Sequence, residues 1–178
     1  NGDVDMYVVC DGHSGHQTSA FSCLFLVDYF SVPNNLQSLS RMTLYKAIER
    51  LNFSLHDRQF PDGSTMATVL FNGQKLVTAH IGDSRVIVAT KDGTVSFETI
   101  DHKSTDRMVF ERVHLAGGRI SANRIGGVLA PGRSLGDYYV NGNTDEPEVK
   151  SYIINPNKDK WLIIACDGLF DVLSNQKI

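Results

Sequence analysis

Three acidic residues in this sequence each follow directly on a short, largely apolar run. Asp11 follows residues 7–10, Asp83 follows residues 77–82, and Asp167 follows residues 161–166. Short runs that are partly β-branched predict buried strands. An ionised carboxylate at the exit of a buried strand is costly unless a cation, an arginine or several N–H groups compensate it. Three such residues, far apart in sequence but alike in context, predict a shared site for a hard cation.

The length and charge of the chain limit its class. A chain of 178 residues fits one domain, which we expect to span 1–178. Its net charge of −3 shows no excess of basic residues, so neither a nucleic acid nor a membrane is expected as a partner. No apolar run reaches the roughly 20 residues of a membrane span. Three cysteines without a C-x-x-C motif predict buried free thiols in a reducing compartment, and we expect an intracellular monomer of the cytoplasm or nucleus.

The pattern of apolar residues changes along the chain. Residues 17–30 predict a buried helix, and Leu44, Ile48, Leu51 and Leu55 predict an amphipathic one. A strand is expected at residues 5–10. Four more are expected at residues 64–71, 75–81, 85–90 and 94–100. Turn signals at Asn72-Gly73 and Asp92-Gly93 suggest that these four form one antiparallel meander.

The rest of the chain predicts shorter elements. Residues 106–116 predict a helix capped by Gly117-Gly118, and a further helical pattern begins at residue 168 and runs to residue 178. Short strands are expected at residues 128–129, 149–154 and 161–166. Early helices followed by grouped strands favour an α+β fold over a doubly wound parallel sheet.

Each acidic residue also has a plainer interpretation. Asp11 could cap the following helix, and Asp83 could pair with Arg85 or bond its own backbone. Asp167 is harder to explain without a ligand, because the strand before it is the most hydrophobic in the chain. Asp171 could be a ligand or simply a residue at the positive end of a helix.

Oxygen donors without paired Cys or His favour Mg²⁺ or Mn²⁺ over Zn²⁺. Two such ions about 3.5–4 Å apart can activate a water and neutralise phosphoryl oxygens. The sequence lacks the nucleotide-binding, zinc-protease and serine-hydrolase motifs G-x-x-x-x-G-K-[ST], H-E-x-x-H and G-x-S-x-G. The residues alone therefore indicate metal-dependent phosphoester chemistry.

The landmarks taken together resemble the metal-dependent serine/threonine protein phosphatases of type 2C. Eight stretches match in the order found in that family. They are residues 8–15, 63–67, 79–85, 101–103, 116–120, 133–137, 146–149 and 162–175. Each stretch alone is weak evidence for the family. Eight stretches in the family's order, over nearly the whole chain, are highly specific for it.

The resemblance implies a fold and a metal centre. The family fold is a sandwich of two antiparallel β-sheets with helices on both outer faces. By resemblance, Asp11 bridges two Mg²⁺ or Mn²⁺ ions, while the Gly12 carbonyl and Asp167 complete the ligands. Asp83 helps to hold a third, weaker ion. A hydroxide between the metals attacks phosphorus directly, without a phosphoenzyme.

The resemblance also implies roles in handling the substrate. His13 corresponds to the family's general acid, which protonates the leaving Ser or Thr alkoxide. Arg133 corresponds to an arginine beside the flap that shapes substrate access. The expected reaction is hydrolysis of phosphoserine and phosphothreonine in protein substrates. A catalytically inactive phosphatase-like binding module is the alternative, and a nuclease is disfavoured by the acidic pI of about 6.0.

The sequence departs from the family pattern in four places. The family's first motif, an Arg with paired acidic residues, is not found in residues 1–6, and its closing Asp-Asn is expected beyond residue 178. We therefore expect a catalytic domain that is incomplete at both ends. Ser14 replaces a usual Gly, and Pro131-Gly132 stands where the family often has Val-Ser. Neither internal change removes a ligand.

Overall fold

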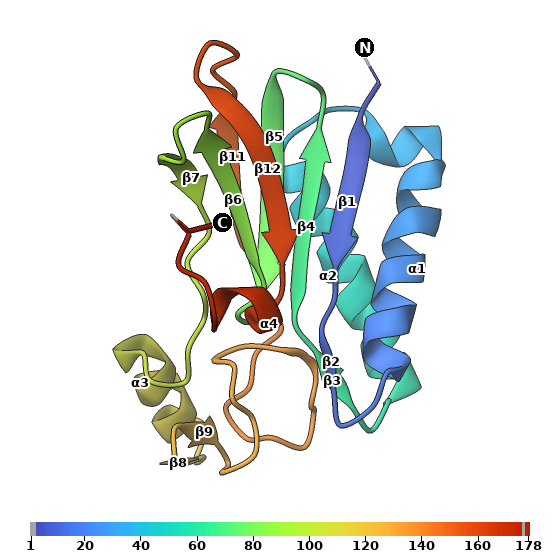
Figure 1. The fold of residues 1–178 in the computed structure, drawn as a ribbon. Coiled ribbons are helices and arrows are strands. Elements are labelled where there is room, and N and C mark those ends of the chain that lie inside the picture. Colours follow the sequence, from blue (N-terminus) through green and yellow to red (C-terminus); the bar gives the residue numbers. More distant parts are fainter. Residues whose placement is uncertain (1–2, 176) are drawn as a thin grey trace.

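Two antiparallel β-sheets stacked face to face form the centre of the molecule in a computed structural model, which describes residues 3–175 and 177–178 (Figure 1). The first sheet has the order β1-β4-β5-β11 and the second β12-β6-β7. The first contains β1 (Asp5–Val9), β4 (Met66–Phe71), β5 (Lys75–Ile81) and β11 (Glu148–Ile153). The second contains β12 (Asp159–Ala165), β6 (Arg85–Thr90) and β7 (Val95–Glu98). The expected α+β class with antiparallel sheets is confirmed.

Two long helices cover the outer face of the first sheet. They are α1 (Gln17–Ser31) and α2 (Arg41–Arg58), joined through a 3-10 turn η1 (Pro33–Leu36). Leu44, Ile48 and Leu51 of α2 are fully buried against β4 and β5. Their spacing of three and four residues gives the helix one apolar face, as the sequence predicts.

The strands alternate their side chains between two cores. In β4, Met66 and Leu70 face the helices, whereas Ala67 and Val69 face the second sheet. Val86 and Val88 of β6 meet them from the opposite sheet. Because both faces of β4 and β5 are buried, apolar residues lie on both sides of each strand instead of alternating with exposed polar ones.

The expected four-stranded meander is wrong. β4 pairs with β5, and β6 pairs with β7, but β5 and β6 belong to different sheets. The chain crosses from one sheet to the other at Gly82–Ser84, where Gly82 has a φ of +91°. A Cβ at Gly82 would lie 2.8 Å from Cγ2 of Thr65, so only glycine fits this turn. The link between residues 81 and 85, which lies inside the expected meander, thus joins the two layers.

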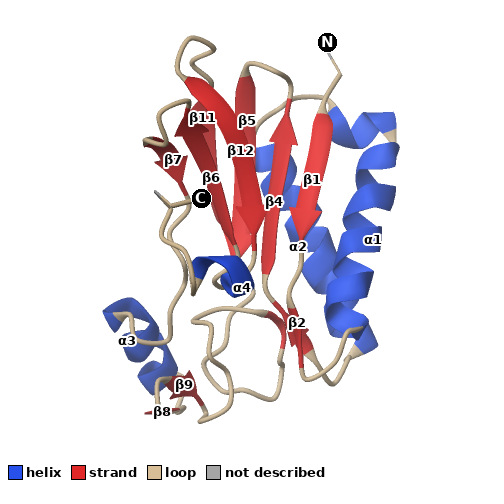
Figure 2. Ribbon diagram, in the orientation of Figure 1, coloured by secondary structure: helices blue, strands red, loops and turns tan. Residues whose placement is uncertain are grey.

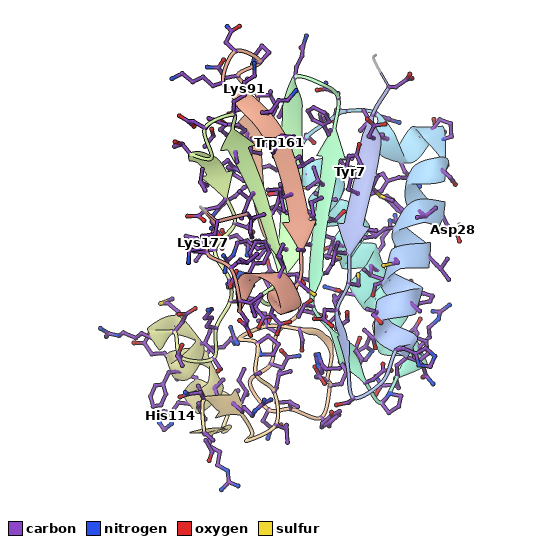
Figure 3. The ribbon with its side chains drawn as sticks, in the orientation of Figure 1. Tyr7, Asp28, Lys91, His114, Trp161 and Lys177 are labelled. Carbon is purple, nitrogen blue, oxygen red and sulfur yellow. The ribbon has the colours of Figure 1, made fainter. Side chains whose placement is uncertain are left out.

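The helices of the described residues are distributed unevenly over the two outer faces. Both long helices lie on the first sheet, and in the described part of the chain no long helix covers the second (Figure 2). Trp161 of β12 lies on this open face and is 56% exposed, although the sequence predicts a strand buried on both sides (Figure 3). The two long helices are consecutive and joined by a short connection, which keeps them in one layer.

A small lobe, residues 103–142, lies at one end of the sandwich (Figure 1). It contains α3 (Arg107–Leu115), β8 (Ile120–Ser121) and β9 (Arg124–Ile125). Val109, Val113 and Ile125 form the centre of its own apolar core. The predicted cap is confirmed, because Gly117, with a φ of +72°, donates its N–H to the carbonyl of His114.

Three two-residue strands connect this end of the sandwich. They are β2 (Gly12–His13), β3 (Gly63–Ser64) and β10 (Leu135–Gly136), in the order β10-β3-β2. The strand expected at residues 128–129 is reduced to one isolated bridge between Leu129 and Ile125. The final helix, α4 (Asp167–Phe170), is shorter than the pattern from residue 168 to 178 predicts; residue 176 lies outside the described residues.

The three cysteines Cys10, Cys23 and Cys166 are free, as expected, but each is half-buried rather than buried. Cys10 and Cys23 form a hydrogen-bonded pair, which lowers the pKa of the Cys23 thiol to about 7. Within the described residues, no helix has the length and apolar character needed to cross a bilayer.

Candidate active site

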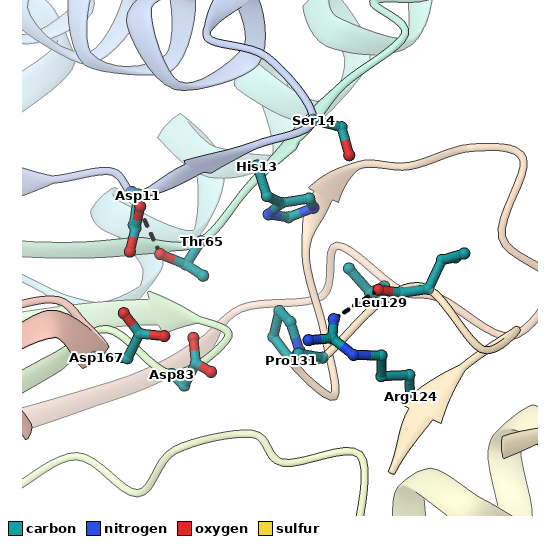
Figure 4. Close-up of a pocket in the computed structure, with 11 residues that line it drawn as sticks. Asp11, His13, Ser14, Thr65, Asp83, Arg124, Leu129, Pro131 and Asp167 are labelled. Atoms are coloured by element: carbon teal, nitrogen blue, oxygen red, sulfur yellow. Dashed lines mark hydrogen bonds between the residues drawn. The ribbon is translucent and has the colours of Figure 1, made fainter. Parts of the chain in front are cut away.

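The three predicted carboxylates meet in one cavity at the end of the sandwich that faces the lobe (Figure 4). Asp11, Asp83 and Asp167 come shortly after β1, β5 and β12, and all line a space of about 350 Å³. The three strands end at the same edge, so residues 72 or more positions apart converge (Figure 1). The three carboxylates predicted to lie together are therefore clustered, and their binding of a metal stays a prediction.

The plainer interpretation of Asp11 is excluded by the hydrogen bonds around α1. The N-cap position of this helix is His16, which makes no side-chain cap. Asp62, which is distant in sequence and 2% exposed, caps the helix instead. Its carboxylate accepts hydrogen bonds from the N–H groups of Gln17 and Thr18 at 2.7 and 3.0 Å. Asp11 is thus not used to cap the helix.

Asp83 does not pair with Arg85 either. The Arg85 guanidinium instead forms a two-point ion pair with Asp101, at 2.8 and 2.6 Å, and lies over the ring of Phe170. Among the described residues, no Lys or Arg pairs with Asp11, Asp83 or Asp167. The charge of this cluster therefore has no cationic partner in that part of the protein.

Thr65 connects two of the ligand-bearing loops. Its N–H donates to the Asp11 carbonyl at 2.9 Å, and its hydroxyl lies 2.6 Å from the hydroxyl of Ser84. The Asp11 N–H also points to the Thr65 hydroxyl, at 3.4 Å. These bonds hold the backbone beside Asp11 against the backbone beside Asp83, so the two carboxylates have a fixed relation.

The electrostatics of the cluster favour a bound cation. Burial, followed by the nearby charge of Asp167, raises the pKa of Asp83 to about 6. Burial and the charge of Asp11 raise the pKa of Asp167 above its usual range. Carboxylates whose ionised forms are destabilised by each other gain most from a divalent cation between them. The donor set of this chain therefore fits Mg²⁺ or Mn²⁺.

The immediate donor group includes one thiol. Ligand atoms of Asp11, Cys166 and Asp167 all lie within 4.8 Å of one another. Burial raises the pKa of Cys166 above its ordinary value, which keeps the thiol protonated at neutral pH. A protonated thiol is a poor ligand for hard cations, so the carboxylates remain the principal donors.

Gly12, whose carbonyl the resemblance suggests as a ligand, lies in β2. A Cβ there would come within 2.6 Å of the Ser19 hydroxyl.

A second group, His80, His102 and Glu148, also has metal-ligand composition. The two imidazole rings are stacked, with centroids 4.4 Å apart and planes 9° from parallel. His102 Nδ1 accepts the Gly82 N–H at 3.1 Å, which leaves the proton of the neutral ring on Nε2. That nitrogen then has no lone pair to give, and burial keeps the His102 ring neutral by lowering its pKa to about 3. This group serves the turn at Gly82 rather than a metal.

His13 lies on the wall of the same cavity and has an acidic partner that the sequence analysis missed. Its Nε2 donates to Asp137 Oδ2 at 2.6 Å, and Asp137 is 1% exposed. The Ser134 hydroxyl donates to the same oxygen at 2.6 Å, which fixes the carboxylate. This hydrogen bond raises the pKa of His13 above its ordinary value, although burial opposes the effect. Asp137 lies within one of the stretches that match the type 2C family. It is 124 positions from His13 in the sequence, so no local pattern connects the two residues.

The arginine in the cavity is not the one that the resemblance suggested. Arg133 does not line the space; its Nη1 donates to the Glu146 carbonyl at 2.8 Å. Arg124 of β9 lines the cavity opposite the carboxylates (Figure 4). Its Nη1 donates to the Val128 carbonyl at 2.8 Å, which orients the guanidinium along the lobe. The substrate role of Arg133 stays a prediction, and Arg124 is a residue that sequence reasoning missed.

Comparisons with known proteins agree with this geometry. The chain is 28% identical to protein phosphatase 1B of Rattus norvegicus over 205 residues, covering 99% of this chain and 52% of that protein. It is 30% identical to human protein phosphatase 1A over 196 residues, covering 97% of the chain and 51% of that protein. The chain thus spans about half the length of these curated relatives.

Solved structures share the fold. A sex-determining protein of C. elegans matches with a TM-score of 0.85 at 26% identity, over 98% of this chain and 46% of that one. A serine-threonine phosphatase 2C from Toxoplasma gondii matches with a TM-score of 0.76 at 19% identity, over 98% of this chain and 71% of that one. The family profile described as protein phosphatase 2C matches residues 1–178. The chain therefore belongs to the protein phosphatase 2C family.

Proposed function

We propose that this protein hydrolyses phosphoserine and phosphothreonine in protein substrates with the help of Mg²⁺ or Mn²⁺. The observation that carries the proposal is the convergence of Asp11, Asp83 and Asp167 in one cavity whose wall holds His13. Membership of the protein phosphatase 2C family supports metal-dependent phosphatase chemistry. The acidic cluster provides the metal site, and the opposite wall provides room for a phosphoester.

Asp11 and Asp167 are the residues that we expect to hold two metal ions, with the Gly12 carbonyl beside them. Asp83 is placed to contribute to a third, weaker ion, since it lines the same cavity and its charge interacts with that of Asp167. When bound, such ions activate a water and neutralise charge on the phosphoryl oxygens. Direct attack by that water requires no phosphorylated residue of the enzyme. The three carboxylates keep their spacing because their strands belong to packed sheets.

His13 is proposed to protonate the leaving alkoxide. Its Nε2 is committed to Asp137 at 2.6 Å, whereas Nδ1 has no hydrogen-bond partner among the described residues. The ionised carboxylate of Asp137 stabilises the imidazolium, so the protonated ring can present an Nδ1–H to the substrate oxygen. An alkoxide of serine or threonine is a poor leaving group and benefits from such a donor.

The inactive binding module remains the competing hypothesis, and the site argues against it. A scaffold has no need for three clustered carboxylates at strand ends, two of which, Asp83 and Asp167, have raised pKa values. Nor does it need a buried Asp137 aimed at a half-exposed histidine. These features cost stability and are explained by a catalytic role.

The proposal is tested by phosphate release from a phosphothreonine peptide, with Mn²⁺ or Mg²⁺ and with EDTA. We expect metal-dependent release by the full-length natural protein and its loss in Asp11→Asn, a change that removes charge at nearly constant volume. Calorimetric titration with Mn²⁺ on both proteins provides a second readout. A folded wild-type protein that neither binds metal nor releases phosphate would overturn the proposal and favour the scaffold.

A further inference from the structure

We propose that a second cavity, beside the active site on the 103–142 lobe, binds acidic side chains that flank the phosphorylated residue of a protein substrate. The inference rests on the proposed phosphatase function and adds a preference among substrates to it. The cavity has a volume of about 470 Å³ and is lined by Gly117, Gly118, Arg119, Val128, Tyr139 and Asn141, among others. None of these residues belongs to the carboxylate cluster.

The two cavities are neighbours joined by one side chain. Val128 lines both the carboxylate cavity and the second cavity, and its side chain is 59% exposed. A peptide whose phosphorylated residue lies at Asp11 and Asp167 can therefore continue over Val128 into the second cavity. The path follows the surface of the lobe, opposite the acidic wall.

Tyr139 makes a second connection between the sites. Its ring lines the second cavity and is 61% exposed, whereas its hydroxyl lies 3.4 Å from Asp137 Oδ1. Asp137 is the partner of His13. An exposed aromatic ring anchored at one end offers a flat surface against which a peptide can pack.

The floor of the second cavity is built rather than incidental. A Cβ at Gly118 would overlap the carbonyl oxygen of Asn141, so this residue must be glycine for the two segments to approach. Val113 and Val140, at 1% and 7% exposure, pack beneath them in the lobe's own core. The cavity therefore has a floor that is defined by the backbone and by the lobe's own core.

The charge of the lobe identifies the occupant. Residues 103–142 contain six Lys or Arg and three Asp or Glu, whereas the whole chain has a net charge of −3. Arg119 is exposed, and its guanidinium makes no ion pair or hydrogen bond among the described residues, whereas Arg124 donates one guanidinium N–H to the Val128 carbonyl. Two guanidinium groups along one path favour carboxylates of a peptide. Outside the lobe, Asp and Glu outnumber Lys and Arg, which disfavours a nucleic acid and leaves a peptide as the ligand that the charges favour.

The test compares two phosphothreonine peptides that differ only in charge. One carries Asp and Glu on both sides of the phosphothreonine, and the other carries Asn and Gln at the same positions. In the Mn²⁺-loaded full-length protein, we expect kcat/KM to favour the acidic peptide about ten-fold at low salt, mainly through KM. Arg119→Gln should reduce that preference about three-fold, the scale of one exposed ion pair.

Arg50→Gln is the matched control, because Arg50 is exposed on α2, in the helical layer, and the change in charge is the same. A charge exchange provides an independent check: Arg119→Glu should improve on wild type with a peptide that carries Lys at the flanking positions. Equal kcat/KM for both peptides in wild type, or an equal effect of Arg50→Gln and Arg119→Gln, would overturn the inference. Failure of the proposed function itself looks different, because then neither peptide is hydrolysed.

Discussion

The two walls of the active-site cavity are built in opposite ways. The acidic wall carries Asp11, Asp83 and Asp167 at the ends of strands in two packed sheets. The opposite wall belongs to the 103–142 lobe, whose residues Arg124 to Pro131 lie on a two-residue strand, turns and loops. The acidic wall is fixed by the cores of the sandwich, whereas the lobe rests on a small core of its own.

This difference separates chemistry from recognition. Metal ligands require ångström precision, which strands held in packed sheets provide. A surface that selects among peptides can instead be carried by loops on a separate core, because changes there leave the ligands in place. We therefore expect changes in the acidic wall to affect turnover with every substrate, and changes at Arg119 and Arg124 of the lobe to affect mainly discrimination among peptides.

The largest effect is expected for Asp167→Asn. The substitution removes one ligand charge at constant volume, so hydrolysis should fall by about 10²-fold or more, on the scale of lost electrostatic stabilisation in an active site. The rise in Tm that saturating Mn²⁺ gives the wild type should shrink with it. Both are measured by phosphate release and by thermal denaturation with and without Mn²⁺. Unchanged turnover at saturating Mn²⁺ would show that Asp167 is not a ligand.

His13→Ala should give a loss that depends on the leaving group. Without the proton donor, hydrolysis of a phosphothreonine peptide should slow by about 10²-fold, the lower end of general acid catalysis. An aryl phosphate, whose leaving group needs no protonation, should lose much less. Steady-state kinetics on the two substrates provide the comparison. Equal losses on both would remove the assigned role.

Asp137→Asn should weaken the same step without removing it. The amide cannot stabilise the imidazolium as a carboxylate does, so we expect a loss about ten-fold smaller than that of His13→Ala. In the double variant, Asp137→Asn should add little to His13→Ala, because coupled residues are non-additive. Additive losses would mean that Asp137 acts on the site independently, for example through Ser134.

Gly82→Ala tests whether the crossing between the sheets positions the acidic wall. Alanine there adds the strain of a positive φ and a Cβ 2.8 Å from the Thr65 side chain. Gly93→Ala is the matched control, because Gly93 has a φ of +85° but no atom within 4 Å of the added Cβ. We expect about 1 kcal/mol of destabilisation for Gly93→Ala from backbone strain alone. Gly82→Ala should cost more and raise the Mn²⁺ concentration needed for activity.

The smallest predicted effect concerns stability without metal. The pKa of Asp83 is raised to about 6, so the folded state binds its proton more tightly than the unfolded chain does. The metal-free protein should therefore become more stable as pH falls from 7 through 6 toward 4 in EDTA. Asp83→Asn should be more stable than wild type at pH 7 and should lose this part of the pH dependence. Urea unfolding at several pH values measures both, and an identical pH dependence in the two proteins would contradict the assignment.

Much of the local structure was predictable from the sequence. The strands at residues 75–81 and 85–90 have the bounds predicted for them. Asp11, Asp83 and Asp167 come together as expected because each is tied to a strand end, and strand ends follow from the hydrophobic pattern. Whether they bind metal stays a prediction.

The pairing of the strands was not predictable in the same way. A strand between two sheets and a strand in a meander have the same apolar pattern, so nothing in β5 and β6 distinguishes a hairpin from a crossing. The direction of Arg124 and the contact of Asp137 with His13 also depend on where loops bring distant segments. Long-range geometry of this kind is decided by packing, which leaves little trace in the local sequence.

The placement of Asp11 and Asp167 has a mechanical consequence. Asp11 continues from a strand of the first sheet and Asp167 from a strand of the second, and the layer between the sheets is largely apolar. An ion held by both carboxylates would link the two sheets of the sandwich. The link would then resist sliding of one sheet over the other at the catalytic end. The stiffness of the molecule would therefore depend on the same ion as its reaction.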